Sequence, residues 1–291
     1  MLGNERRMDD PALLIRIAIP ISVVLIVIAL GLRCSLADAA YVLDRPSLLV
    51  RSIVAMNLIM PLLAVGLVSS FDLKTPVKVA LVALAISPIP PFLPSKRLNL
   101  TSRGYIYGIV VAAAICSVVL VPATAALLSA HFHTQHVPAV KVLLVVALTV
   151  LAPLSAGLII QRLRPTRAPN IASILDKVGT GLLLVASVAE LVMEWPNFRS
   201  LYGDGTVAAA IILSALGLLV GHLLGGPDPQ NRTVLALATA SRHPGVALVA
   251  GISASAQTPR LVTAAVLLAF VMSTMVSVPY AAWRKRVHAP R

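Results

Sequence analysis

Two stretches, Ser87-Pro88-Ile89-Pro90-Pro91-Phe92-Leu93-Pro94 and Ser241-Arg242-His243-Pro244-Gly245, interrupt what otherwise reads as membrane-spanning helix. Each lies inside a long apolar segment, and the second places a charge at mid-membrane depth. Irregular backbone persists at that depth only where it is buried in protein or lines a cavity. A pair of interrupted helices, one in each half of a chain, is typical of the binding site of a secondary transporter.

The composition indicates a polytopic membrane protein. Of 291 residues, 58% are hydrophobic and only 12% are charged, whereas about a quarter of a soluble domain is charged. Nine apolar stretches are long enough to cross about 30 Å of hydrocarbon. We therefore predict an all-α fold with about nine transmembrane helices, over residues 12–32, 47–69, 75–94, 104–130, 137–163, 171–193, 206–224, 231–252 and 259–283.

The basic residues predict the location and orientation of the chain. The net charge is +13, and most Lys and Arg lie between apolar stretches, which favours lipid headgroups over nucleic acid as partner. With the loop after the first span in the cytoplasm, the inner side holds the majority of the basic residues. We expect an integral protein of a bacterial plasma (inner) membrane, with the N-terminus outside and the C-terminus cytoplasmic.

The chain shows signs of an inverted repeat. A broken helix followed by a helix with an internal proline occurs twice, with Pro122 and Pro279 as the two prolines, and the paired spans cross in opposite directions. Such repeats are common in secondary transporters. We predict a first repeat over residues 1–130, with its broken helix at about 75–97, and a second over residues 131–291, with its broken helix at about 231–252.

Arg242 is the strongest single signal for a site. A charge at the bilayer centre costs about 2.5–3.5 kcal/mol by insertion scales, and the acids of this chain lie near the ends of its spans. Backbone carbonyls, water or a visiting anion must satisfy the guanidinium, and the proline-rich break after Ser87 would free carbonyls for it. Two interpretations stay open: Arg242 takes part in binding an anion, or it only holds the two broken helices together by hydrogen bonds.

Small polar residues and breaks near Arg242 complete the candidate substrate site. His243 could couple transport to protons or serve as a hydrogen-bonded structural residue. Gly245 permits close approach of another backbone. Hydroxyl and amide side chains within the spans could line a cavity or bond their own helix. The further candidates are Ser241, Thr239, Asn57, Ser117, Pro88, Pro90 and Pro91.

Motifs for other chemistry are missing from the sequence. It contains no zinc-protease HExxH, no Walker-type glycine loop and no intramembrane pair of acids, so an enzyme or an ATP-driven pump is not expected. We expect no cofactor. The histidines of the His131–His136 stretch could bind zinc, but no fourth ligand is near, so we predict no metal site.

At these residues the chain resembles the bile acid:sodium symporter superfamily over nearly its full length. The resemblance rests on the end of the first span and its acidic loop (Ala29–Leu32, Leu36–Asp38, Arg45-Pro46), on Asn57–Pro61, on Pro88 and on Arg232-Thr233. It implies ten helices in two inverted five-helix repeats, here without the first helix. It also implies a core domain that crosses at the broken helices, a panel domain beside it, and transport of organic anions, usually with sodium.

The chain departs from this family at the residues that hold sodium. Where the family has Glu and then Gln-Asn in the second broken helix, this chain has Leu237, Ser241 and Arg242, and Phe92–Pro94 occupy the place of a Ser-Asn pair. Ser117 is the surviving candidate from the sodium-site helix. A sodium site without a carboxylate is electrostatically poor, so we expect Arg242 to do the structural work of the ion.

These observations predict a secondary transporter of a small or amphipathic organic anion that works by alternating access and is coupled to protons or to no ion rather than to sodium. The alternatives are a non-transporting membrane sensor or scaffold of the same fold, a sodium-coupled symporter, and a metalloid exporter. The last would need a thiol at a broken helix, and Cys116 is poorly placed for it. The sequence predicts neither the substrate's identity nor the oligomeric state.

Overall fold

The computed structural model describes residues 11–89, 103–132, 139–201, 203–255 and 257–287. All regular structure in these residues is helical, because the apolar spans leave no water to satisfy open backbone groups. The elements are α1 (Pro11–Arg33), α2 (Leu36–Ala40), α3 (Pro46–Ile53), η2 (Val54–Ile59), α4 (Met60–Ser70), α5 (Thr75–Ile86), α6 (Arg103–Phe132), α7 (Ala139–Val146), η3 (Ala147–Leu151), α8 (Ala152–Leu163), α9 (Ala168–Met193), α10 (Trp195–Arg199), α11 (Thr206–Leu224), α12 (Pro229–Ala240), α13 (Pro244–Ala254) and α14 (Pro259–Val287).

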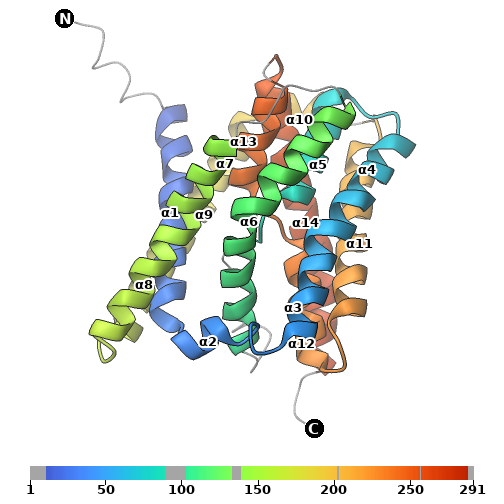
Figure 1. Ribbon diagram of the computed structural model, residues 1–291. Helices are drawn as coiled ribbons and strands as arrows, with labels where there is room; N and C mark the ends of the chain where they lie inside the picture. The colour runs from blue at the N-terminus through green and yellow to red at the C-terminus, as the bar shows by residue number, and fades with distance from the viewer. Residues whose placement is uncertain (1–10, 90–102, 133–138, 202, 256, 288–291) are drawn as a thin grey trace, which may run out of the picture.

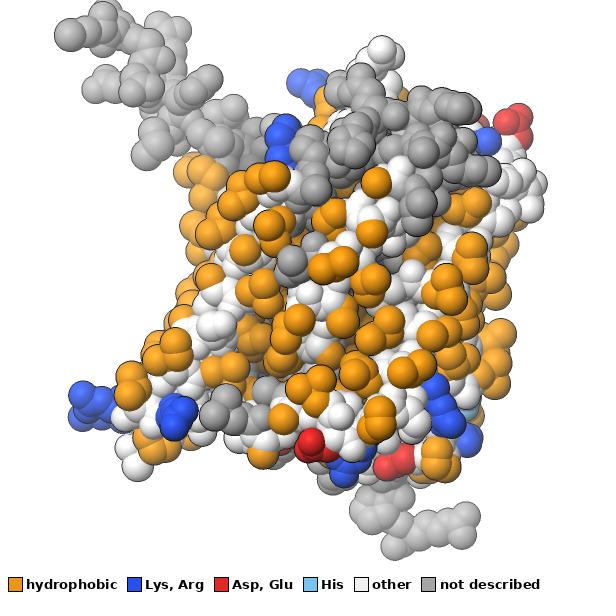
Figure 2. Space-filling view, in the orientation of Figure 1, with side chains coloured by type: hydrophobic (Ala, Val, Ile, Leu, Met, Phe, Trp, Pro, Cys, Tyr) orange, Lys and Arg blue, Asp and Glu red, His pale blue; other side chains and the backbone are white. Residues whose placement is uncertain are grey.

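The all-α polytopic fold is confirmed. Within the described residues six helical segments are long and apolar enough to span a membrane, and three shorter apolar helices, Ile17–Arg33, Thr75–Ile86 and Gly104–Ser117, fall in the other predicted spans. Figure 2 shows hydrophobic side chains over the middle of the visible face, with charged side chains gathered toward its two ends. Such a face suits lipid tails between two headgroup layers.

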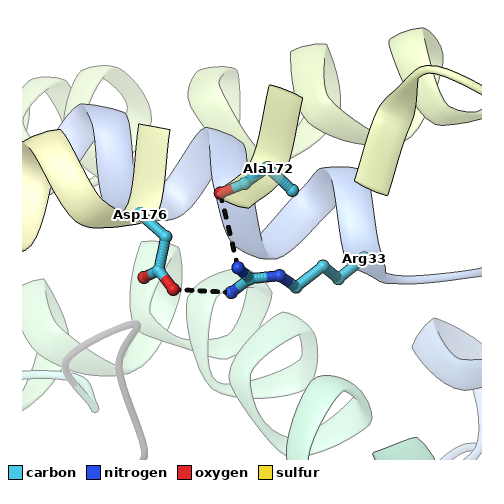
Figure 3. A network of polar contacts seen from close by, with 3 residues as sticks. All are labelled: Arg33, Ala172 and Asp176. Carbon is cyan, nitrogen blue, oxygen red and sulfur yellow. Dashed lines mark hydrogen bonds and ion pairs between the residues drawn. The ribbon is translucent and has the colours of Figure 1, made fainter. Parts of the chain in front are cut away.

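Helices α1, α8 and α9 form one packed group, at the left of Figure 1. Gly31 and Gly157 let α1 and α8 touch, since a Cβ on Gly157 would lie 2.4 Å from the Ile28 carbonyl oxygen. At the end of α1 the Arg33 guanidinium donates to Asp176 at 2.9 Å and to the Ala172 carbonyl of α9 (Figure 3). The group is therefore held by close backbone packing and, at one end, by an ion pair.

A second group contains α4, α5 and α11 to α14. Here α11 packs on α12 through Gly217 and Gly221 on one face of α11 and through Gly225, the residue that follows the helix, all spaced four residues apart. A Cβ on Gly221 would lie 2.5 Å from both the Cα of Ala236 and the carbonyl oxygen of Leu235. Small residues at this spacing are how membrane helices bring their backbones together. The assignment of these two groups to panel and core domains, like the division into repeats at residue 130, stays a prediction.

Both interruptions of the helices begin at the predicted residues. Helix α5 ends at Ile86, after which Ser87, Pro88 and Ile89 are not helical. Helix α12 ends at Ala240, and α13 starts at Pro244 after three non-helical residues. Proline at the first helical position suits α13, because the missing N–H is one that no helix start can pair internally.

Candidate functional site at the crossing of the broken helices

The two interruptions meet and bond to each other. The backbone N–H of His243 donates to the carbonyl of Pro88 at 2.9 Å. Next to it, Nη1 of Arg242 donates to the carbonyl of Ser87 at 3.1 Å. These carbonyls are available because helix α5 stops at Ile86, and the helical partner of the Ser87 carbonyl would be the N–H that Pro91 lacks. Segments about 155 residues apart in sequence thus form one junction.

A π-helical turn supplies the third partner of the junction. In η2 the N–H of Met60 reaches back five residues, to the carbonyl of Ala55. The next residue, Pro61, has no N–H, so the Met56 carbonyl lacks the corresponding donor. Nη2 of Arg242 fills that position at 3.0 Å. The guanidinium therefore joins its own segment to two others, through the carbonyls of Ser87 and Met56, which proline leaves without a helical partner.

The charge of Arg242 is enclosed by protein. The residue is 5% exposed, and neither ion pair of the described residues involves it. Its Nε has no hydrogen-bond partner among these residues. Arg242 also lines a cavity of about 20 Å³ together with Ser214, Phe270 and Ser273, enough for about one water molecule.

The hydroxyl groups of this cavity are already used as donors. Ser214 donates to the carbonyl of Ala210 at 2.8 Å, and Ser273 donates to that of Ala240 at 2.9 Å. Their remaining lone pairs can accept hydrogen bonds but cannot hold an anion. In the cavity, the positive group available to a negative ligand is Arg242.

His243 and Gly245 shape the start of α13. His243 is 3% exposed, and its Nδ1 accepts from the N–H of Val246 at 3.4 Å, so the ring acts as the N-cap of the helix. A Cβ on Gly245 would lie 3.2 Å from the ring of His243. Ser241, half-buried, donates its N–H to the carbonyl of Leu237.

Three other candidates bond their own helices. The hydroxyl of Thr239 donates to the carbonyl of Leu235 at 2.7 Å, and that of Ser117 donates to Ala114 at 2.7 Å. The amide of Asn57 points to the carbonyl of Ile53 at 3.4 Å. The structure thus brings Pro88, Arg242 and His243 together. The side chains of Thr239, Ser117 and Asn57 instead bond carbonyls of their own helices. Pro90, Pro91 and most of the His131–His136 stretch lie outside the described residues.

A family model described as the Sodium Bile acid symporter family matches residues 20–200, more than half of the chain. The chain belongs to this family. The comparison with curated proteins finds no match. Members of the sodium bile acid symporter family are transporters, so this chain is an integral membrane transporter of that superfamily.

The matched residues of this symporter family member stop before α12 begins, so the second interruption with Arg242 lies beyond them. The junction also does not suit a sodium ion. The carbonyls of Ser87 and Met56 already accept from a guanidinium, and no cluster of three or more His, Cys, Asp or Glu occurs in the described residues. A bound cation would face a fixed positive charge without a compensating carboxylate.

Carbonyls of the first break were expected as partners of Arg242, and that of Ser87 is one of them. Sequence reasoning missed three other groups of the junction in this family member: the carbonyl oxygen of Met56 and the side chains of Ser214 and Ser273. For Met56 a signal existed, because a proline inside an apolar helix always leaves a carbonyl without its donor. The serines gave no comparable signal, since a serine in a membrane helix most simply bonds its own backbone.

Proposed function

We propose that this protein is a secondary transporter of a small or amphipathic organic anion, and that its transport is not driven by sodium. The observation that carries the proposal is the buried guanidinium of Arg242, which bonds the carbonyls of Ser87 and Met56 at the crossing of the interrupted helices. It joins the segments that a bound cation would join through the same kind of oxygen atoms.

Electrostatics argue against sodium beside this group. Two unit charges 4 Å apart repel by about 4 kcal/mol at an effective dielectric constant of about 20. A millimolar affinity corresponds to about 4 kcal/mol of binding free energy. The guanidinium would therefore cancel an ordinary sodium affinity. The same charge attracts a carboxylate or sulfonate, for which arginine is a strong partner.

The cavity beside Arg242 is too small to hold an organic anion in this conformation. At about 20 Å³ it is far smaller than the roughly 300 Å³ that small-molecule sites enclose. An organic anion that approaches Arg242 from this cavity requires the helices around it to separate. Relative movement of the group α1, α8 and α9 against the group α4, α5 and α11 to α14 would open such a path, as in other transporters built from two units.

Replacing sodium by choline should leave uptake unchanged. We expect less than a twofold difference when proteoliposomes take up taurocholate, as an amphipathic anion, or benzoate, as a small one. The anion is first chosen by its ability to raise the melting temperature of the purified protein. A proton gradient is then imposed at constant sodium to test His243 as a coupling group. A large loss of uptake in choline would refute the sodium-independent mechanism.

A sensor or scaffold of the same fold is the second candidate. One observation favours it: both Nη atoms of Arg242 donate to backbone carbonyls, as expected of a residue that only holds the helices together. A sensor would gain thermal stability with an organic anion and show no flux in proteoliposomes. Flux that saturates with the same anion would exclude it.

A further inference from the structure

Four helices end close together at the lower right of Figure 1, where Arg and Lys side chains gather. Arg51 of α3 and Arg232 of α12 both reach the turn between α11 and α12. The Nη1 atom of Arg51 lies 3.2 Å from the position of a Cβ on Gly226, and the Nε of Arg232 donates to the Gly226 carbonyl at 2.6 Å. Two positive side chains thus approach the same turn, and an anion between them would reduce their mutual repulsion.

The end of α14 adds further positive charge to this turn. Nε of Arg284 donates to the hydroxyl of Thr233 at 2.8 Å, and its Nη2 donates to the carbonyl of Pro229 at 2.6 Å. These bonds fix the last turn of α14 on the start of α12. Lys285 and Arg286 follow, both exposed.

One acid, Asp228, lies on this turn, against a basic cluster of Arg51, Arg232, Arg284, Lys285 and Arg286. Asp228 uses its Oδ1 to cap α12, accepting from the N–H groups of Gln230 and Asn231. The two ion pairs of the described residues, Arg33–Asp176 and Lys74–Asp204, include neither Arg51 nor Arg232. The surface around Gly226 is therefore positive.

Aromatic and apolar side chains border the basic cluster. His222 of α11 bonds the hydroxyl of Tyr280 at 2.8 Å, and its ring lies 5.8 Å from that of Trp283. Trp283 is 51% exposed, and one to two turns further into the membrane Leu223 and Leu219 of α11 are 68% and 53% exposed. Tryptophan and tyrosine are enriched at the headgroup level of membranes. A charged group bound here would thus carry its apolar part along α11.

We propose that this basic cluster binds the phosphate of one anionic phospholipid, with Arg51 and Arg232 as its charged contacts and with an acyl chain along Leu219 and Leu223. The lipid bridges the ends of α3, α11, α12 and α14. Because α12 leads directly into the junction at Arg242, the lipid steadies the helix on which that junction depends. The occupant is a lipid rather than free phosphate because the exposed leucines continue from the cluster along the membrane.

The two tryptophans of the chain allow a direct test. Trp283 lies at the cluster, and Trp195 lies on α10 at the other end of the molecule (Figure 1). Purified full-length protein with Trp195→Phe is reconstituted in nanodiscs, and quenching of Trp283 by brominated phosphatidylglycerol is compared with quenching by brominated phosphatidylcholine. We expect at least fivefold preference for phosphatidylglycerol, and Arg51→Gln should reduce it about fivefold, the effect of one basic residue near an anionic lipid.

Three controls distinguish a specific lipid site from non-specific attraction of anionic lipid to a basic protein. Trp283→Phe leaves Trp195 as the probe, which should show less than twofold preference. Arg199→Gln, at the Trp195 end, should leave the preference at Trp283 unchanged. Inorganic phosphate at 10-fold excess over the lipid should not displace phosphatidylglycerol. Equal quenching by both lipids at Trp283, the same preference at both tryptophans, no effect of Arg51→Gln, or displacement by inorganic phosphate would each overturn the proposal.

Discussion

Arg242→Ala abolishes uptake while most of the protein still folds. The substitution removes two hydrogen bonds from a charged donor, at about 1.5–3 kcal/mol each. It also removes the cost of a charge at mid-membrane depth, about 2.5–3.5 kcal/mol. The net loss is about 1–2 kcal/mol, so the yield of monodisperse protein should fall only modestly. The crossing, however, loses the group that joins Ser87 and Met56, and the anion loses its positive partner.

The measurement is uptake in proteoliposomes, normalised to the folded protein recovered by size-exclusion chromatography. Arg242→Lys keeps the charge, but its single ammonium group lacks the planar fork that reaches two carbonyls at once, so it should retain part of the activity. Arg199→Gln, on the short helix α10, serves as a matched loss of charge. Normal transport by the Ala variant would show that Arg242 is dispensable.

The same variant tests whether the guanidinium stands in for a cation. Without it, the carbonyl oxygens of Ser87 and Met56 face an empty position, and hard cations prefer oxygen ligands. We expect sodium, but not choline, to raise the melting temperature of Arg242→Ala, while the unmodified protein shows no sodium-dependent change. If sodium changed the melting temperature of both proteins equally, the hypothesis that the guanidinium takes the place of a cation would be wrong.

Gly221→Leu should prevent α11 from packing on α12. A Cβ at this position would already lie 2.5 Å from backbone atoms of Leu235 and Ala236. A side chain could change its rotamer to make room, but these backbone atoms cannot. Overpacking of this kind costs about 3 kcal/mol. Because α12 ends at the junction, the displacement also moves Arg242 away from its carbonyls. Thermal melting in detergent and the yield of monodisperse protein measure the effect.

The matched control is Gly66→Leu in α4. A Cβ on Gly66 meets nothing within 4 Å, and leucine favours helix over glycine by up to about 1 kcal/mol. This variant should melt at the same temperature as the unmodified protein or slightly higher. A loss of stability equal to that of Gly221→Leu would mean that any added side chain is harmful, and that the contact between α11 and α12 is not the cause.

Much of the fold could be predicted from residue patterns. Each of the nine apolar stretches contains a helix within the described residues, and the interruptions begin at Ser87 and Ser241 as proline chemistry requires. The site was harder to predict from the sequence. Thr239 and Ser117 carry the right chemistry, but inside a helix the carbonyl three or four residues back is the nearest acceptor, and both hydroxyls use it. Sequence alone gives no measure of that competition.

The sequence by itself determined that this chain crosses a membrane, where two of its helices break, and that a positive charge sits at the second break. These follow from local rules: apolar length, the missing N–H of proline, and the absence of acids near Arg242. Only the tertiary structure decided which atoms receive the charge. The carbonyls of Ser87 and Met56 are 155 and 186 residues from Arg242, and helix packing alone brings such distant backbone groups together.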